Sequence, residues 1–551
     1  MLVALALGAA ALALPPTRVA EWLVGGAPRQ TIADVELGVW LLKGLLALHA
    51  GALAAAARSR FPWTATAPLA EGVLSEPPAA TRREIVMLTS LLLLALLLRL
   101  VALGDGLWFD EIQTLVQSVR APMGNVIATF QNSNQHALFS LLAKASIALT
   151  EESAWALRLP AVLLGVASLA ALFWFASMVT SRLEALLAVA LLTVSYHHVW
   201  FSQNARGYTG LMLWTLLATG LFARMLSSRE TRTWGVAAAY ALCMALAIYT
   251  HLTAVFIVVA HALVWAVLAY KNRRTDIWPV ALVPLVALVL AGTLSLLLYS
   301  LALPQLVRVM QVPVMEGQET AWKSLGWALM TMYDGLTQGS WLMVGVMAAG
   351  ALVGLAGVAS FWRRHWSLAA LMLLPALLTA AALVANSHNL WPRFFFFSAG
   401  FAVLIAIRGV FALSPILPTR HASALATAAI LFVIAVSAST VRHAWGPKQD
   451  YEGARRFVES KVSPDDAVVT LDMTIIPYNT YYKIPWDSVS NGADLESVEK
   501  KHTRTWVLYQ FPVRLEAVQP TTWARLQERY ETVGEFPGTL GGGSIFVKVS
   551  E

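Results

Sequence analysis

Long apolar runs alternate with short polar stretches along most of the chain. Each run is about twenty residues long, which is the length that a helix needs to cross the hydrocarbon core of a bilayer. The opening run, "MLVALALGAAALALPP", lacks the charged start of a signal peptide, so we expect an uncleaved helix there. The pattern predicts about thirteen membrane spans, near residues 2–16, 36–57, 85–103, 157–178, 183–201, 207–226, 235–250, 252–270, 277–300, 340–361, 366–385, 394–412 and 422–441.

The polar stretches between the runs differ in charge, and this difference predicts orientation. Basic residues gather in short loops on one side of the predicted membrane: "RSR" at 58–60, "TRR" at 81–83, "RMLSSRETR" at 224–232, "KNRR" at 271–274 and "FWRR" at 361–364. Positive loops stay in the cytoplasm, so this side is predicted to be cytoplasmic. The other side receives longer, aromatic-rich loops at about 104–156 and 301–339, together with everything after residue 441.

The tail after residue 441 has a different pattern, because no run in it is long enough to span a membrane. "DYEGARRFVESK" and "TWARLQERYE" have apolar positions at helical spacing, and "DAVVTLDM", "RTWVLYQF" and "GSIFVKVS" read as strands. The glycine run "GTLGGGS" reads as a hairpin or loop, since no helix follows it. Strands mixed with helices predict a small extracytoplasmic α/β domain.

These patterns predict an α-helical polytopic membrane protein in three parts. Residues 1–84 would form two transmembrane helices and a cytoplasmic loop. Residues 85–441 would form the membrane catalytic module with the outer loop 104–156, and residues 442–551 the soluble domain. The composition agrees, because 58% of the residues are hydrophobic and only 13% are charged, against roughly 25% charged residues in soluble domains. The net charge of +7 belongs mostly to orienting loops and does not indicate nucleic acid. The single cysteine, Cys243, excludes an intramolecular disulfide and a CxxC metal site.

Two adjacent carboxylates stand where the chain leaves a predicted span, in "GLWFDEIQT" (106–114). Asp110 fits as the N-cap of a helix, with Gln113 closing a capping box. A carboxylate held at the boundary between water and membrane is also suited to act as a general base. The cap does not explain Glu111 beside it, so both interpretations stay open here.

Further polar residues lie at the predicted outer surface. His136 lies where the outer loop returns to the membrane, and "SQNARGYT" (202–209) forms a short outer turn that contains Gln203, Arg206 and Tyr208. These residues also fit an ordinary interfacial belt of aromatics with a snorkelling arginine. Positive charge is scarce on this side, however, and Arg393 and Arg99 stand near outer span ends as well. Because guanidinium groups suit phosphate oxygens, the pattern predicts an anionic, lipid-borne ligand.

The order of these motifs resembles one enzyme family. The outer-loop Asp110–Glu111 pair, "NSNQHALFSLLAK", "SQNARGYT", "YTHLTAVF" (249–256) and "PRFFFF" (392–397) follow one another as in the family 39 and 83 glycosyltransferases of the GT-C fold. That group includes the protein O-mannosyltransferases and the aminoarabinose transferase of lipid A. The resemblance covers roughly residues 85–412. The chain differs from the usual pattern at "QHALFSLL", at Asn204 and Gly207, and in the phenylalanines of "PRFFFF".

The resemblance implies transfer of a sugar, usually with inversion, from a polyprenyl-phosphate carrier to a glycan, lipid or protein acceptor. It places the reaction on the extracytoplasmic face of the inner membrane. Asp110 would be the general base, with Glu111 either orienting it or sharing a divalent metal ion with it, and His136 would be a third candidate ligand. Arg206 and Arg393 would bind the lipid phosphate, and His136 and Tyr208 would shape the sugar pocket. Arg99 and Gln203, with His251 as a weaker candidate, would be further substrate-binding residues.

The alternative function is a transporter or flippase for a lipid-linked or anionic solute. Such a protein would need polar residues at interrupted helices near the middle of the membrane. The charged residues here cluster instead at one predicted surface, which favours the transferase.

Overall fold

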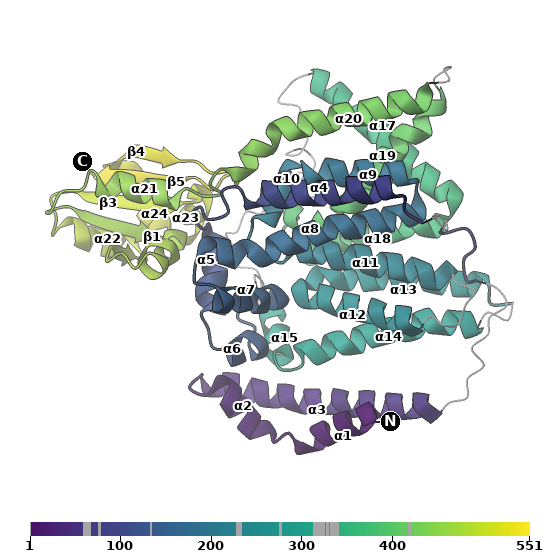
Figure 1. Cartoon of the computed structure of the whole chain (residues 1–551). Coiled ribbons are helices and arrows are strands. Elements are labelled where there is room, and N and C mark those ends of the chain that lie inside the picture. Colours follow the sequence, from purple (N-terminus) through teal and green to yellow (C-terminus); the bar gives the residue numbers. More distant parts are fainter. Residues whose placement is uncertain are drawn as a thin grey trace.

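The computed structural model describes residues 2–58, 68–74, 79–132, 135–227, 234–274, 278–311, 326, 330, 341–416 and 421–550. It consists of a large helical bundle with a small sheet domain at one end (Figure 1). Most of the predicted outer loop 301–339 lies outside the described residues.

The bundle is built from long apolar helices. Their bounds are α1 (Leu2–Ala13), α2 (Pro16–Val24), α3 (Arg29–Arg58), α4 (Arg82–Leu100), α7 (Ala137–Leu149), α8 (Ala154–Val179), α9 (Arg182–Thr193), α10 (Tyr196–Ser202), α11 (Tyr208–Ser227), α12 (Trp234–Thr250), α13 (Val255–Lys271), α14 (Trp278–Tyr299), α17 (Trp341–Arg364), α18 (Trp366–Ala385), α19 (Ala399–Leu413) and α20 (Ala422–Thr440). Within the described residues, nine helices are long and apolar enough to cross a membrane, or up to eleven if two bent pairs are each one span. The chain is therefore a multi-pass membrane protein, as predicted.

Two of the predicted spans are not straight helices. The predicted span 2–16 ends at Ala13, and the chain then turns by 83° into α2, because Pro15 and Pro16 cannot continue the backbone ladder. The predicted span 183–201 is broken into α9 and α10 with a bend of 64°. The break falls at Val194 and Ser195, and Ser195 has an extended backbone. The second break directs α10 toward the turn that contains Arg206.

Short elements cover one end of the bundle. They are α5 (Phe109–Gln113), the π-helix η1 (Thr114–Val119), α6 (Met123–Ala128), η2 (Leu252–Ala254), α15 (Leu303–Gln311), η4 (Pro392–Ser398) and η6 (Val441–Trp445), whereas η5 (Ser414–Ile416) follows α19 at the other end. At the opposite end the basic loops meet: the Ala70 amide bonds to the Leu226 carbonyl, Asn272 to Leu69, and Arg364 to Gly72. Figure 1 shows these loops at the end away from the sheet domain.

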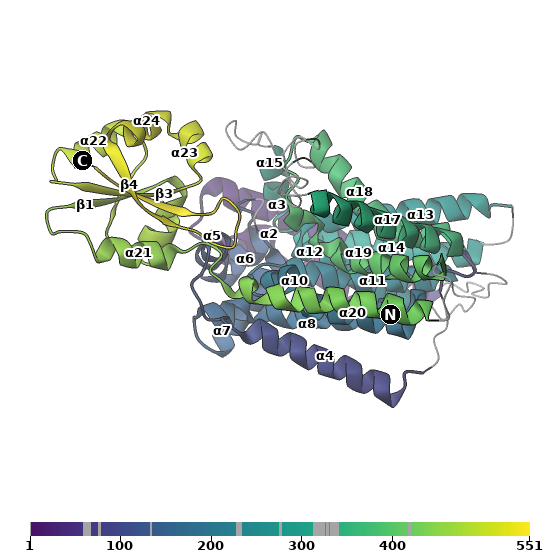
Figure 2. The same cartoon turned by 90° about the horizontal axis from the view of Figure 1, so that it is seen from above.

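The C-terminal domain contains a five-stranded mixed sheet in the order β2-β1-β3-β5-β4. Its elements are α21 (Tyr451–Glu459), β1 (Ala467–Leu471), η7 (Asp472–Thr474), η8 (Ile476–Tyr481), β2 (Asp487–Val489), α22 (Gly492–Glu499), β3 (Thr505–Gln510), α23 (Pro512–Val518), α24 (Pro520–Arg529), β4 (Tyr530–Phe536) and β5 (Ile545–Ser550). β1 is parallel to β2 and β3, whereas β5 is antiparallel to β3 and β4. β1 and β3 are buried along their whole length because helices cover both faces. Figure 2 shows α21 on one face and α22, α23 and α24 on the other.

The sheet domain and the outer loop share one hydrophobic core. Phe109 and Ile112 of α5 pack in the same cluster as Tyr451, Trp506 and other residues of the C-terminal domain. This shared core fixes α5, and with it the Asp-Glu pair, between the bundle and the sheet.

Candidate functional site

Helix α5 begins two residues earlier than the N-cap interpretation predicts. Its N-cap is Trp108, and Asp110 is the second residue of the helix, so the prediction that Asp110 caps it is wrong. The side chain of Glu111, the third residue of the helix, caps its start instead, because Glu111 Oε2 accepts from the Trp108 amide at 3.4 Å. The next amide, that of Phe109, donates to Gln449 Oε1 at 2.9 Å. The carboxylate of Asp110 is thereby left out of the capping arrangement.

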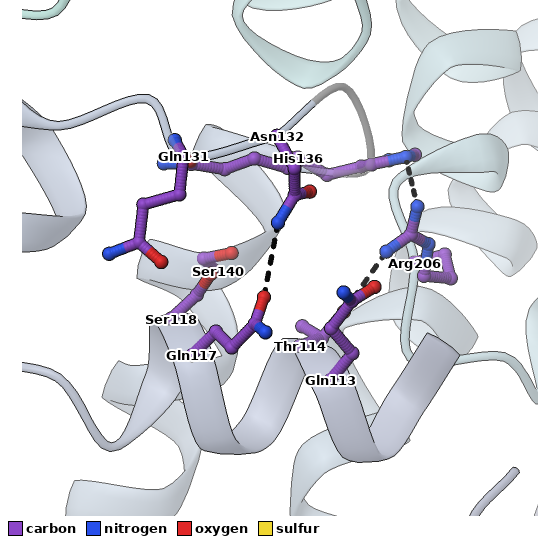
Figure 3. A pocket seen from close by; sticks show the side chains of 10 residues that line it. Gln113, Thr114, Gln117, Ser118, Gln131, Asn132, His136, Ser140 and Arg206 are labelled. Atoms are coloured by element: carbon purple, nitrogen blue, oxygen red, sulfur yellow. Dashed lines mark hydrogen bonds between the residues drawn. The ribbon is translucent and has the colours of Figure 1, made fainter. Parts of the chain in front are cut away.

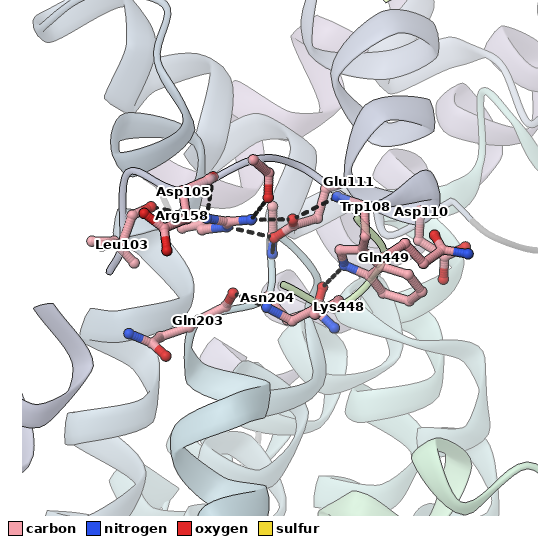
Figure 4. Close-up of polar contacts among 12 residues, drawn as sticks. Leu103, Asp105, Trp108, Asp110, Glu111, Arg158, Gln203, Asn204, Lys448 and Gln449 are labelled. Atoms are coloured by element: carbon pink, nitrogen blue, oxygen red, sulfur yellow. Dashed lines mark hydrogen bonds and ion pairs between the residues drawn. The ribbon is translucent and has the colours of Figure 1, made fainter. Parts of the chain in front are cut away.

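Glu111 is completely buried and anchors α5 to the bundle (Figure 4). Its two oxygens form a forked ion pair with Arg158 of α8, at 2.6 and 2.8 Å, and Oε1 also accepts from the Ala205 amide at 2.7 Å. Burial alone would raise the pKa of this carboxyl, but Arg158, Lys448 and the hydrogen bonds hold the pKa below its usual value. Glu111 therefore remains ionised and holds its helix in place.

Two cations of this arrangement were not predicted from the sequence. Arg158 is buried and also donates to the carbonyls of Leu103, Asp105 and Gly106. The signal that singled out Arg99, an arginine near the outer end of an apolar run, applies equally to Arg158. The second cation, the ammonium of Lys448, donates to the Gln203 carbonyl at 2.8 Å, and burial lowers its pKa to about 7. No sequence pattern marks Lys448, because it lies in the connection to the C-terminal domain.

Asp110 faces a different partner, at the partly open edge of this end. Its Oδ2 accepts from Arg393 Nη1 at 3.4 Å, with the two side chains 11% and 30% exposed. Within the described residues, this is the carboxylate's only hydrogen bond. The guanidinium of Arg393 also lies 5.3 Å from the ring centre of Trp391 and 5.8 Å from that of Phe394. The pair is therefore longer and less completely enclosed than the tight pair of Glu111.

Four of the predicted residues meet in one cluster beside this pair. Arg206 donates to Thr114 Oγ1 at 3.1 Å, and its Nη2 lies 2.9 Å from His136 Nε2. The ring of His136 lies 5.1 Å from that of Tyr208 and 4.9 Å from that of His251. Phe394, the neighbour of Arg393, lies 5.7 Å from His251 and connects the cluster to the Asp110 side.

The imidazole of His136 is neutral in this cluster. Burial lowers its pKa well below the usual value, and Arg206 and Arg393 lower it further. Nδ1 accepts from the Gly207 amide at 3.0 Å, so the neutral ring carries its proton on Nε2, which lies 2.9 Å from Arg206 Nη2. The cluster therefore presents arginines and a neutral ring rather than a second titrating charge.

Arg99 and Gln203 lie apart from the cluster. Arg99 is fully buried and donates to carbonyls of α4 and α9 and to Ser202. Gln203 donates to the carbonyls of Arg99 and Val101. These contacts tie α4, α9 and α10 together, and the structure brings neither side chain to Asp110.

The predicted metal ligands do not form a set that fits a divalent ion. In the described part of the chain, no three His, Cys, Asp or Glu side chains come close enough to hold a metal. The oxygens of Glu111 are occupied by Arg158 and amides, and Nδ1 of His136 accepts from the Gly207 amide. Metal dependence stays a prediction of the sequence alone.

Comparison with known proteins confirms the resemblance seen in the motifs. Residues 135–299 match the family described as dolichyl-phosphate-mannose-protein mannosyltransferase. This segment includes His136, Arg206, Tyr208 and His251. No curated protein matches the chain in sequence.

Several solved structures are similar in shape, each with a TM-score below 0.5. The archaeal oligosaccharyltransferase AglB from Archaeoglobus fulgidus, in complex with an inhibitory peptide and a dolichol-phosphate, is 13% identical; the match covers 84% of this chain and 75% of that one, with a TM-score of 0.46. ArnT from Cupriavidus metallidurans in the apo state is 13% identical over 84% of this chain and 97% of that one, with a TM-score of 0.45. The same protein bound to undecaprenyl phosphate is 12% identical, with 85% and 98% covered and a TM-score of 0.42.

Proposed function

We propose, from the glycosyltransferase resemblance, that this protein transfers a sugar from a polyprenyl-phosphate donor to an acceptor hydroxyl at the extracytoplasmic membrane surface. One observation carries this proposal. The mostly buried carboxylate of Asp110 contacts Arg393, and Arg206 contacts Thr114 one helical turn away, at one end of a membrane bundle. A site at this level can be reached by a lipid-borne donor from the bilayer and by a water-soluble acceptor.

Asp110 would be the general base. It accepts the proton of the acceptor hydroxyl while the acceptor oxygen forms a bond to the anomeric carbon of the sugar. The bond from that carbon to the phosphate oxygen breaks, and polyprenyl phosphate leaves with the electron pair. Attack from the face opposite the phosphate inverts the configuration of the sugar. Glu111 takes no part in the proton transfer, because Arg158 and the Ala205 amide occupy its oxygens.

Arg206 and Arg393 would hold the phosphate and stabilise its charge as it leaves. Guanidinium groups present several donors in a plane that suits phosphate oxygens. The Nε of Arg393 is buried and has no hydrogen-bond partner among the described residues. Such a donor is costly when unsatisfied, and a phosphate oxygen would satisfy it.

The proposed orientation of the protein in the membrane rests on the positive charge of its loops. Asp110 and the C-terminal domain share one end of the bundle, and the basic loops meet at the other. By the positive-inside tendency the reaction face would be extracytoplasmic, in the cytoplasmic membrane of the cell.

A transfer assay with the purified protein in lipid tests the donor class. Polyprenyl phosphate carrying a radiolabelled hexose should donate its label to a cell-envelope extract, whereas a nucleotide-linked hexose should not. Transfer from the nucleotide sugar in the absence of lipid-linked sugar would contradict the proposal. Heat-inactivated protein provides the background.

A further inference from the structure

Thr114 connects two parts of the candidate site through one buried hydroxyl. This hydroxyl donates to the backbone carbonyl of Asp110 at 2.8 Å, and its oxygen accepts from Arg206 Nη1 at 3.1 Å. Thr114 is only 6% exposed. Figure 3 shows its side chain and the guanidinium of Arg206 facing one another, joined by this hydrogen bond. A single side chain therefore joins the helix of the proposed general base to a proposed phosphate ligand.

The position of Thr114 places Arg206 on the face of α5 that carries Asp110. Residues four apart lie on the same face of a helix. The Thr114 amide donates to the Asp110 carbonyl, so the helical pattern extends from Asp110 to Thr114, where the π-helix η1 begins. Turns of π-helix occur frequently at functional sites. Arg206 is thus held one helical turn along from Asp110.

The chemistry of the hydroxyl fixes the direction of its two bonds. A hydroxyl has one hydrogen to donate, and its oxygen has lone pairs that accept. The Asp110 carbonyl accepts that hydrogen, which leaves the oxygen of Thr114 as an acceptor facing Arg206. A guanidinium has donors only, so the two groups are matched. The branched side chain of threonine has few rotamers, and this stiffness keeps the hydroxyl in place.

The other side chain that contacts the guanidinium in Figure 3, His136, does not accept from it. Its Nδ1 accepts from the Gly207 amide at 3.0 Å, so the proton of the neutral ring is on Nε2, the nitrogen beside Arg206. Of these two neighbours, Thr114 is therefore the hydrogen-bond acceptor that sets the direction of the guanidinium.

We propose that Thr114 is a positioning residue for Arg206. Its hydroxyl fixes the guanidinium relative to Asp110, so that the bound phosphate and the proton acceptor keep the mutual arrangement that sugar transfer needs. A misplacement of about 1 Å in such an arrangement can cost about a hundredfold in rate. Thr114 acts through Arg206 and makes no bond to the phosphate. The inference rests on the proposed function, because it requires Arg206 to bind the phosphate.

Binding of bare polyprenyl phosphate to the full-length protein in nanodiscs tests the inference. Thr114→Val removes the hydroxyl and keeps the branched shape, and the Asp110 carbonyl keeps its bond from the backbone amide, so the helix should stay folded. We expect about tenfold weaker binding, near the effect of one charge-assisted hydrogen bond. Thr114→Ser keeps the hydroxyl and should bind like the wild type. Wild-type binding by Thr114→Val would overturn the inference.

Thr129→Val is the matched control. Thr129 lies in the same outer loop, is 7% exposed, and donates to the carbonyl four residues earlier, that of Asn125, at 2.7 Å. The change removes the same kind of bond to a backbone carbonyl but leaves Arg206 untouched. Thr129→Val should therefore bind polyprenyl phosphate like the wild type. Equal loss of binding in the Thr114→Val and Thr129→Val proteins would overturn the inference.

A double variant separates positioning of Arg206 from a purely structural role. In Arg206→Met the guanidinium is absent, and binding through Arg393 remains. If Thr114 acts through Arg206, then Arg206→Met/Thr114→Val binds the lipid as strongly as Arg206→Met alone. An equal effect of Thr114→Val in both backgrounds, or a Thr114→Ser protein as weak as Thr114→Val, would overturn the inference alone. Wild-type binding by Arg206→Met would overturn the phosphate role of the proposed function, and the inference with it.

Discussion

The two neighbouring carboxylates of α5 have opposite surroundings, and this contrast defines their roles. Glu111 is fully enclosed by a forked ion pair with Arg158, whereas Asp110 has one long contact with Arg393 and remains partly open to water. A base must reach its substrate, and only Asp110 is placed to do so. Glu111 instead holds α5 in place and thereby fixes the position of Asp110.

Removing the enclosed carboxylate should damage the fold rather than the chemistry. In Glu111→Gln the Arg158 guanidinium stays buried without a counter-charge, which typically costs about 3–5 kcal/mol. We expect a clear drop in thermal stability, with part of it restored in the double variant Glu111→Gln/Arg158→Met. A Glu111→Gln protein as stable as the wild type would contradict the anchoring role.

The same pair predicts how stability depends on pH. The folded-state pKa of Glu111 is lowered, so its contribution is complete above the unfolded-state pKa of about 4.3 and is lost as the pH falls through the folded value. Melting temperatures of wild type and Glu111→Gln should therefore converge as the pH falls below about 4. A gap that stays constant down to pH 3 would exclude this linkage.

Binding of polyprenyl phosphate should depend on the shape of the cation at Arg206 and Arg393 as well as on its charge. Arg393→Lys and Arg206→Lys keep the charge but lose the planar fork. Charge-assisted hydrogen bonds are worth about 1.5–3 kcal/mol, so each variant should bind polyprenyl phosphate roughly tenfold or more weakly. Arg456→Lys, at an exposed position of α21, is the control. Unchanged affinity in both site variants would remove the phosphate role.

At the scale of elements, α5 is capped from the far end of the chain. The Phe109 amide donates to Gln449, whose own amide donates to Gln510 of β3, and Tyr451 donates to the same Gln510 oxygen. Gln449 is 340 residues away from Phe109 in sequence. The C-terminal domain thus supplies a hydrogen-bond acceptor for the first turn of α5, which carries Asp110.

Loss of that acceptor should reduce both stability and turnover. Gln449→Ala leaves the Phe109 amide buried and unpaired, at about 1–3 kcal/mol, and frees the first turn that carries Asp110. We expect a lower kcat with little change in donor affinity. Gln527→Ala, an exposed glutamine of α24, should have no effect. Normal kcat in a destabilised Gln449→Ala protein would mean that the cap serves stability only.

The sequence predicted those helices and strands that have a regular apolar spacing within their own residues. The predicted strands correspond to β1, β3 and β5, and the predicted helices to α21 and α24, because their apolar spacing is regular. The three-residue β2 and the mostly exposed β4 carry too weak a pattern to stand out. The cap of α5 was misassigned because its true partners, Glu111 in its pair with Arg158 and the distant Gln449, depend on tertiary packing.

In the candidate site as well, some features could be predicted from local sequence and others depend on tertiary packing. His136, Arg206, Tyr208 and His251 were predicted from their positions at outer span ends, and the fold brings all four together. Which arginine contacts substrate and which supports the fold depends on the packing of helices. Sequence position therefore grouped Arg99 with the arginines proposed to bind the lipid phosphate, whereas the fold buries it among carbonyls.

For the whole molecule, the proposed extracytoplasmic site places the outer loop and the C-terminal domain on the same side of the membrane. In a background without Cys243, Glu151→Cys and Lys500→Cys should react with an impermeant thiol reagent in intact cells. Arg274→Cys, in a basic loop, should react only after permeabilisation. Labelling of Arg274→Cys in intact cells, or protection of Lys500→Cys, would invert or break the proposed topology.

The rate of sugar transfer by Asp110→Asn measures whether Asp110 is the general base. Asparagine preserves the size of the side chain and the start of α5 but cannot accept a proton near neutral pH. Loss of a general base typically costs 10²–10⁴-fold in rate, so transfer should fall at least about a hundredfold, while the variant stays folded and still binds polyprenyl phosphate. Asp105→Asn, at an exposed position five residues upstream, is the matched control and should keep the wild-type rate. Wild-type transfer by a folded Asp110→Asn protein would contradict the account.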